Sequence, residues 1–385
     1  MFINFVELNA NKLKNFLILI LLCIIIILIN ENTELKDRKT QVNSFNLIHN
    51  KTKRKNIGIV GYYIDNNIGN QLIKYSMDVV LKKYGFNPIL ISLKEVSNVN
   101  MNFLKKYVNI KEIKSYITDL NESDYDFLVV NSDQVWAYNF KRLIQVGFLS
   151  FAKNWNITKF VYAASLGFDH WTSSEEIIKS AKILVKQFSG ISVREQNSIG
   201  IIDKNLGVKP VLVLDPTMLL NKTDYLNIIN NFKTDIDTNR DYLCSYLLDY
   251  SKIKQDYIKN ISKELNYTII TIKIYVENFI EEFIYHYNIC KSIITDSFHG
   301  TVFSIIFNKP FIAFINNFRG NERFFSLNQT FHLNNRFIYP KLFSKNETVL
   351  LKNELNINMT DFNILKDKSI KYLEYNLGLN KSMNF

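Results

Sequence analysis

Residues 290–314 read CKSIITDSFHGTVFSIIFNKPFIAF, and this stretch decides the fold. The apolar runs at 291–295 and 310–315 each predict a buried β-strand, and the apolar residues between them predict a helix. Polar residues interrupt the packing only once, at 296–300, where the first strand turns into the helix. A strand, a helix and a second strand in this order form the building unit of a parallel sheet.

The same alternation runs along the sequence from residue 56 onward. The segment IGIVGYY at 57–63 predicts a first strand, residues 70–84 predict a helix, and residues 87–92 predict a second strand. Further strands are predicted at 127–130, 159–163, 190–193, 211–214, 242–248, 267–274, 291–295 and 310–315.

The predicted strands fall into two series separated near residues 215–240, which predicts two Rossmann-like halves of the α/β class. A chain of 385 residues is too long for one ordinary core and long enough for two. We therefore expect an N-terminal domain at 56–225 and a C-terminal domain at 226–385. A helical pattern at 361–377 ends the second domain and could pack across both halves.

The composition is that of a globular protein, because 47% of the residues are hydrophobic and only 22% are charged. The net charge of +11 permits an anionic partner such as nucleic acid, acidic lipid or an anionic substrate. Most of this charge comes from scattered lysines, and only the run KTKRK at 51–55 is dense. We therefore expect no nucleic-acid partner.

An apolar run begins at Phe16 and ends at Ile29. Its 14 residues are fewer than the ~20 that usually span a bilayer, and no small-x-small cleavage pattern follows. We therefore expect a short uncleaved anchor at 1–30, an apolar helix outside the globular fold, and a polar, basic linker at 31–55. The anchor would associate with the membrane and hold the globular part on the cytoplasmic face, although lysines on both sides determine its orientation poorly.

The three cysteines, Cys23, Cys244 and Cys290, suggest neither a disulfide framework nor a CxxC metal pattern. A reducing compartment is therefore expected. The sequence contains no HExxH, GxSxG or paired-carboxylate motif, and the turn at 65–72 has neither GxGxxG nor GKS/T. It therefore predicts no metal and no cofactor.

Polar residues follow several predicted strands directly. Ligands of open α/β sheets bind beyond the carboxyl ends of the strands, so these positions are candidates for a cleft. The cleft candidates are Asn70, Asp133, Gln134, Ser165 and Asp215. Asp133 and Gln134 could equally fix the neighbouring loop at Trp136. Asp215, before Pro216, could simply start a helix.

The strand-to-helix junction of the opening stretch contains His299, one of only five histidines. If Gly300 and Thr301 begin the helix, its free backbone N–H groups form an anion site with His299 beside it. Alternatively, Asp296 or Ser297 caps the helix, and His299 is hydrogen-bonded in the core.

Arg194, directly after the predicted strand at 190–193, would be the natural companion of this anion site. A guanidinium holds a carboxylate or a phosphate through two parallel hydrogen bonds. The alternative for Arg194 is an ion pair with Glu195 or another acid.

Six segments occur in the order found in one protein family. They are NIGNQLIKYSM (67–77), VVNSDQVW (129–136), YAASLG (162–167), SVREQNSIGII (192–202), DPTMLL (215–220) and IITDSFHGTVFSIIFNKPFIAF (293–314). Through them, over about residues 56–340, the chain resembles the polysaccharide pyruvyl transferase family. The resemblance implies two Rossmann-like domains in a GT-B-like arrangement. It also implies transfer of a pyruvyl group from phosphoenolpyruvate, as co-substrate, to a sugar of a cell-surface polysaccharide or its lipid-linked precursor, forming a ketal.

The resemblance further implies that His299 and Arg194 contact phosphoenolpyruvate and act in catalysis. The donor site would also include Ser297, Gly300 and Thr301, and the cleft candidates would face the saccharide acceptor. Some members carry Arg-Leu-His where this chain has SFH at 297–299. One cationic contact is therefore absent, or is supplied from elsewhere, for example by Arg319 or Arg323.

Two other functions remain open on the sequence alone. A GT-B glycosyltransferase that uses a nucleotide sugar would share the architecture, because a fold does not fix a function. A membrane-tethered protein that binds an anionic polymer without catalysis would show a steep dependence on salt. The sequence predicts no particular oligomeric state.

Overall fold

The strand-helix-strand unit of residues 290–314 forms as the sequence predicts. β10 (Ser292–Thr295) leads into α9 (Phe298–Ile306), which returns the chain to β11 (Phe311–Phe314), and the two strands pair in parallel. The computed structural model describes residues 54–93, 100–113, 119–137, 142–171, 173–273, 277–315, 319–333, 335–340 and 346–381.

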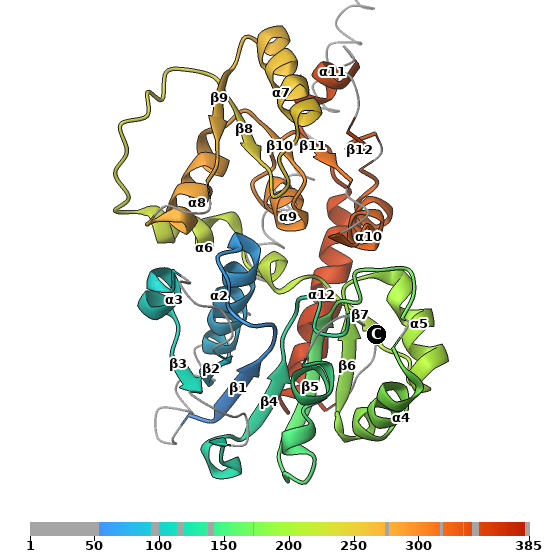
Figure 1. Ribbon diagram of the computed structural model, residues 1–385. Coiled ribbons are helices and arrows are strands. Elements are labelled where there is room, and N and C mark those ends of the chain that lie inside the picture. The colour runs from blue at the N-terminus through green and yellow to red at the C-terminus, as the bar shows by residue number, and fades with distance from the viewer. Residues whose placement is uncertain are drawn as a thin grey trace, which may run out of the picture. The chain divides into compact units, whose positions relative to one another are not determined.

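The described strands form two sheets, in the orders β3-β2-β1-β4-β5-β6-β7 and β12-β11-β10-β8-β9 (Figure 1). All pairings within them are parallel. The strands of the first sheet are β1 (Asn56–Val60), β2 (Asn87–Leu93), β3 (Ile110–Ile113), β4 (Phe127–Val130), β5 (Thr158–Ala164), β6 (Gly190–Val193) and β7 (Val211–Leu212). The second sheet adds β8 (Tyr242–Tyr246), β9 (Thr268–Thr271) and β12 (Phe337–Ile338) to β10 and β11.

The predicted α/β class with two parallel sheets is therefore confirmed. Two strands were not predicted, β3 and β12, and both lie at a sheet edge. β3 has the sequence IKEI, in which charged residues interrupt the apolar pattern, and β12 is only two residues long. Edge strands of this kind carry too little apolar pattern to be recognised. The predicted division into 56–225 and 226–385 stays a prediction.

Helices connect the strands (Figure 1). They are α2 (Ile68–Lys83), α3 (Asn102–Tyr107), α4 (Glu175–Leu184), α5 (Gln196–Leu206), α6 (Lys222–Leu226), α7 (Lys252–Leu265), α8 (Phe279–Ile289), α10 (Glu322–Phe331), α11 (Asn346–Lys352) and α12 (Met359–Asn376). Local signals set their ends. The side chain of Asn67 caps α2 by accepting from Asn70 N, and Gly207 ends α5 at a φ of +71°.

An apolar core joins helices that belong to the two sheets. Tyr225 of α6 lies at its centre. The Tyr225 hydroxyl is 2.9 Å from Ser76 Oγ of α2, and its ring centroid is 4.8 Å from that of Phe303 in α9. This packing fixes α2 against α9 and thereby places the start of α9 next to the start of α2.

The C-terminal helix α12 contacts elements of both halves. The Tyr372 hydroxyl donates to the Val161 carbonyl of β5 at 2.7 Å, so the helix is bonded to the first sheet. The Phe362 ring lies 5.8 Å from the Phe331 ring at the end of α10. Residues 359–376 thus tie the end of the chain back to its first sheet.

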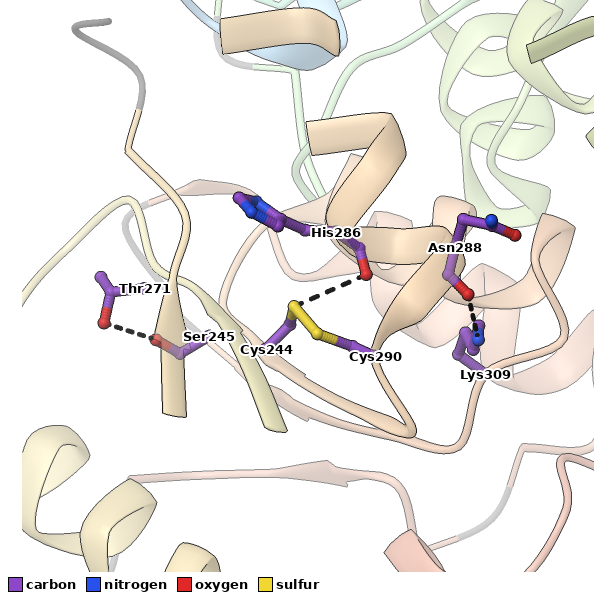
Figure 2. The surroundings of a disulfide bond; sticks show 7 residues. All are labelled: Cys244, Ser245, Thr271, His286, Asn288, Cys290 and Lys309. Carbon is purple, nitrogen blue, oxygen red and sulfur yellow. Dashed lines mark hydrogen bonds between the residues drawn. A yellow bond between two sulfur atoms is a disulfide. The ribbon is translucent and has the colours of Figure 1, made fainter. Parts of the chain in front are cut away.

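The cysteines depart from the sequence-based expectation, because Cys244 and Cys290 form a disulfide bond (Figure 2). Cys244 lies in β8, and Cys290 lies between α8 and β10, the strand that pairs with β8. Their Cα atoms are therefore 5.8 Å apart although 46 positions separate them in the sequence. Strand pairing, which the cysteine spacing does not reveal, brings them together. The compartment in which the protein works stays a prediction.

The predicted anchor at 1–30 lies outside the described residues, as does the predicted linker at 31–55 apart from its last two residues. Among the residues that the structure does describe, no helix combines the length and the apolar character needed to cross a membrane.

Candidate functional site

Four of the candidate residues come together at one edge of the first sheet. Asp133 follows β4, Arg194 follows β6 and Asp215 comes shortly after β7, so parallel pairing places them at the same end. His299, the second residue of α9, approaches from the second sheet, and its Nε2 lies 3.6 Å from Asp215 Oδ2. Residues from both sheets therefore make up the candidate site.

All three nitrogen atoms of the Arg194 guanidinium donate hydrogen bonds to neighbouring side chains. Its Nε donates to Glu195 Oε1 at 3.2 Å and its Nη2 to Asp133 Oδ1 at 3.0 Å. Its Nη1 donates to Asp215 Oδ2 at 2.6 Å and to Ser132 Oγ at 3.2 Å. Burial alone would lower the pKa of Arg194, but the three carboxylates outweigh it and hold the pKa above its usual value. The ion pair with Glu195 thus exists, and two further acids join it.

Asp215 both caps a turn and connects Arg194 to His299. Its Oδ1 accepts from the backbone N and the hydroxyl of Thr217 at 3.0 and 2.7 Å, which starts the 3₁₀ turn Pro216–Leu219. Burial raises the pKa of this carboxyl, but the neighbouring His299 imidazole and the charge of Arg194 hold it well below its usual range. Asp215 therefore stays ionised and is suited to orienting its neighbours.

His299 is buried against α2. A Cβ atom on Gly69 would lie 1.9 Å from His299 Nδ1, so only glycine at this position lets the imidazole approach α2 this closely. His299 is 4% exposed, and its Nε2 has no hydrogen-bond partner. An unpartnered nitrogen beside an ionised carboxylate is the feature of the site that points most directly to a ligand.

The other predicted donor residues serve the start of α9. The helix begins at Phe298, two positions earlier than predicted, and Ser297 is its N-cap. Gly300 N donates to Ser297 Oγ at 3.2 Å, and Thr301 N donates to the Ser297 carbonyl at 3.0 Å. These N–H groups are therefore not free to bind an anion, and the expectation that the helix begins at Gly300 and Thr301 is wrong. The capping alternative is correct for Ser297.

Asp133, Gln134 and Ser165 lie together, with Ser165 N donating to the Asp133 carbonyl at 3.0 Å, and two of them retain unpartnered polar atoms. Gln134 Nε2 and Ser165 Oγ are buried without a hydrogen-bond partner. Gln134 packs over Gly167, where a Cβ would lie 2.0 Å from Nε2. Asp133 has a φ of +139°, a backbone conformation that is strained for a residue other than glycine. Strain and unused donors together are typical of a functional site.

Asn70 is fully engaged and orients a lysine that was not predicted. Its Nδ2 donates to the Tyr63 carbonyl at 2.9 Å, and its Oδ1 accepts from Lys74 Nζ at 2.7 Å. Burial lowers the pKa of Lys74 to about 8, despite the charges of Asp65 and Asp133. Lys74 lies one turn into α2, where its position in the sequence looks like that of any helix lysine.

Phe298 was not predicted to belong to the site, whereas Arg323 was named in the sequence analysis as one possible source of a cationic contact. The Phe298 ring centroid lies 4.6 Å from the Arg194 Cζ and 5.2 Å from the Arg323 Cζ. Phenylalanine in an apolar stretch is usually a core residue, so no sequence signal marks it as a platform for two arginines.

The carboxylates around Arg194 outnumber its single positive charge before any ligand is added. Glu195, Asp133 and Asp215 contact Arg194 directly, and among the described residues no group of three His, Cys, Asp or Glu side chains is arranged to hold a metal. An anionic ligand would therefore depend on groups that are not already paired, among them His299 Nε2.

Comparison with known proteins places the fold and the family. The model of the family described as polysaccharide pyruvyl transferase matches residues 67–317. A structure of MnaA from S. aureus with UDP is similar over 86% of this chain and 99% of that chain, with a TM-score of 0.53 and 10% identity. UDP-GlcNAc 2-epimerase from Methanocaldococcus jannaschii is similar over 83% of this chain and 99% of its own, with a TM-score of 0.51 and 15% identity. At such low identity these structures show the two-domain GT-B-like fold alone. No curated protein matches the chain.

Proposed function

Because the chain belongs to the polysaccharide pyruvyl transferase family, we propose that it transfers the pyruvyl group of phosphoenolpyruvate to a sugar. The acceptor would be a cell-surface polysaccharide or its lipid-linked precursor, and the product a pyruvate ketal. Two sugar hydroxyl oxygens bond to C2 of phosphoenolpyruvate while the C2–O bond to its phosphate breaks. One hydroxyl proton moves to the methylene carbon, which becomes the methyl group, and the other leaves with inorganic phosphate.

The observation that supports this proposal most is the unpartnered Nε2 of His299 beside the ionised Asp215. The reaction needs a group that delivers a proton to carbon or stabilises the departing phosphate. A histidine oriented by a carboxylate suits either role at neutral pH. Gly69 and Asp215 fix the imidazole from two sides, so His299 is positioned before any substrate arrives.

Arg194 takes part in the proposed donor site only by exchanging a partner. Of its three carboxylates, Glu195 and Asp215 have side chains 0% and 1% exposed, whereas the Asp133 side chain is 18% exposed. The Asp133 contact is therefore the one that a substrate carboxylate can replace. The released Asp133 would then be free to accept a proton from an acceptor hydroxyl.

The test is phosphate release from phosphoenolpyruvate by the full-length chain in the presence of a saccharide acceptor, with the ketal identified by NMR. His299→Ala should lower kcat by about 100-fold or more, the usual contribution of a positioned acid or base. His170→Ala is the matched control, because this histidine is exposed and lies outside the site. Unchanged turnover in His299→Ala would remove His299 from the mechanism.

A nucleotide-sugar transferase is the rival outcome of the same experiment. The similar structures named above include a complex with UDP and an epimerase of UDP-GlcNAc, and they share only the fold with this chain. Binding of UDP-GlcNAc by the wild-type chain, without binding of phosphoenolpyruvate, would favour the rival and overturn the proposal.

A further inference from the structure

Three guanidinium groups lie near the candidate site, and they differ in their partners. Arg194 contacts three carboxylates. Arg319 forms an ion pair with Asp249, with Nη2 donating to Oδ1 at 2.7 Å. Arg323 donates only to backbone carbonyls, from Nε to Gly320 O at 3.2 Å and from Nη2 to Arg319 O. Among the described residues, no carboxylate lies within ion-pair distance of Arg323.

The backbone around Arg323 is held firmly. Gly320, just before α10, has a φ of +84°, and a Cβ there would lie 2.3 Å from the Gly167 carbonyl of the first-sheet loop. One turn after Arg323, Ser326 Oγ accepts from Gln196 N at 3.2 Å. These contacts bind the start of α10 to the loops that carry Gln134 and Arg194. The position of Arg323 over the Phe298 ring is thus determined by packing rather than by a charged partner.

An unpaired cation in such a position is unfavourable without an anion. Arg323 is only partly exposed. Burial and the charges of Arg194 and Arg319 lower its pKa to about 10, although the charges of Asp133 and Glu195 act in the opposite direction. It therefore remains protonated at neutral pH. A buried charge without a partner destabilises a protein unless a ligand completes it.

A second unused donor lies on the same side. Gln134 Nε2 is buried without a partner and lies 3.0 Å from the position that a Cβ on Gly320 would take. Gln134 Nε2 and the Arg323 guanidinium thus both lie next to Gly320, and donors of these two kinds are suited to a carboxylate or a phosphate.

We propose that Arg323, assisted by Gln134 Nε2, is the main group that holds an anionic group of the donor. Arg194 holds Asp215 in place and contributes to donor binding only where a substrate carboxylate replaces Asp133. The identity of the donor rests on the proposed function. The recognised chemistry is a carboxylate or a phosphate, and phosphoenolpyruvate carries both.

The experiment titrates the full-length protein with phosphoenolpyruvate, inorganic phosphate and pyruvate by calorimetry. Arg323→Gln should raise the Kd of phosphoenolpyruvate by about 10- to 100-fold, the loss expected for a hydrogen bond to a charged group. Arg323→Lys should recover part of the affinity, because lysine keeps the positive charge but cannot form the two parallel hydrogen bonds of a guanidinium. Whichever of phosphate and pyruvate loses affinity in Arg323→Gln identifies the group that Arg323 holds.

Two further variants separate binding from structure. Arg319→Gln tests the neighbouring arginine and should change the Kd less than 3-fold, because Arg319 is already paired with Asp249, and Arg240→Gln on the surface is the neutral control. The ligand-free Tm of Arg323→Gln should not fall, since the variant removes a partly buried positive charge that has no carboxylate within ion-pair distance among the described residues. A purely structural Arg323 would instead lower the Tm and leave the Kd unchanged, which would overturn the inference.

The inference and the proposed function fail in different ways. If the wild type turns over phosphoenolpyruvate and Arg323→Gln keeps its Kd, the inference is wrong and the function stands. If the wild type binds phosphate but not phosphoenolpyruvate, the proposed function is wrong. The inference about Arg323 then stands only if Arg323→Gln binds phosphate more weakly than the wild type does. A wild type that binds none of the three anions overturns both.

Discussion

Two buried acid-cation pairs follow strands in the two sheets, and they have different surroundings. After β10, Asp296 accepts from Lys254 Nζ at 2.6 Å and from the backbone N–H groups of Leu248 and Asp249 at 2.6 and 3.1 Å. After β7, Asp215 accepts from Arg194 Nη1 at 2.6 Å. Both acids are almost fully buried, with 1% and 3% exposed surface.

The neighbours of the two pairs distinguish them. Around Asp296, all of the named donors serve to close the turn after β8 and the start of α7. Around Asp215, the nearby Nε2 of His299 is left without a partner, and Gln134 Nε2 and Ser165 Oγ lie at the same sheet edge unsatisfied. A buried polar cluster after a strand is therefore not in itself evidence of a site, whereas one with unsatisfied atoms is a candidate.

The largest effect is expected from Asp296→Asn. Removing one partner of a buried ion pair leaves Lys254 uncompensated and should lower the free energy of unfolding by about 3–5 kcal/mol. Urea denaturation followed by circular dichroism measures this. The folded fraction should keep the wild-type kcat, because Asp296 serves structure.

The double variant Asp296→Asn with Lys254→Met provides the control. Removing both charges should restore most of the lost stability, since no unpaired ion then remains. If the double variant is no more stable than the single one, the backbone hydrogen bonds of Asp296, rather than its ion pair, determine its contribution.

Asp215→Asn should have the opposite profile. Arg194 keeps two carboxylates, so stability should fall by only about 1–2 kcal/mol, as for one buried hydrogen bond. His299 loses the charge that orients it, and kcat should fall by about 100-fold while the KM for phosphoenolpyruvate changes little. If the KM for phosphoenolpyruvate rises in Asp215→Asn while kcat is unchanged, Asp215 acts in donor binding and not in positioning His299.

Much of the fold could be predicted because apolar runs and helical spacing alternate regularly along the chain. The unit β10-α9-β11 is the clearest case, with strands close to their predicted bounds. The disulfide between Cys244 and Cys290 could not be predicted, since it depends on which strands are neighbours. Neither could β12, whose two residues leave no pattern.

The candidate site was predictable where a residue directly follows a strand, as Arg194 does. A residue that directly follows a strand lies at the carboxyl end of that strand, and parallel pairing places these ends at one edge of the sheet. It was not predictable where the relevant property is that a buried or partly buried cation lacks a carboxylate within ion-pair distance, as for Lys74 and Arg323. Ser297 shows a third limit of the sequence. The same residue types occur in a helix N-cap and in an anion site, and only the residue at which the helix begins shows that Ser297 is the cap.

Two of the buried lysines, Lys74 and Lys254, extend the comparison and predict a pH dependence. Lys254 has Asp296 as its partner, whereas the hydrogen bonds of Lys74 go only to oxygens of Asn70. Burial lowers the pKa of Lys74 from 10.5 to about 8. The unfolded chain then binds more protons than the folded one between these values, so the free energy of unfolding rises with pH across this window.

For Lys74 alone this gain should be about 1 kcal/mol between pH 8 and pH 9. Other groups titrate in the same range, so the informative quantity is the difference between the wild type and Lys74→Met. The variant should be the more stable protein at pH 7, and its advantage should shrink by about 1 kcal/mol between pH 8 and pH 9. Lys254→Met is the matched control and should lose stability at pH 7 and at pH 9, because it leaves Asp296 unpaired. An advantage of Lys74→Met that does not change with pH would mean that Lys74 stays charged in the folded protein, held by Asp65 and Asp133.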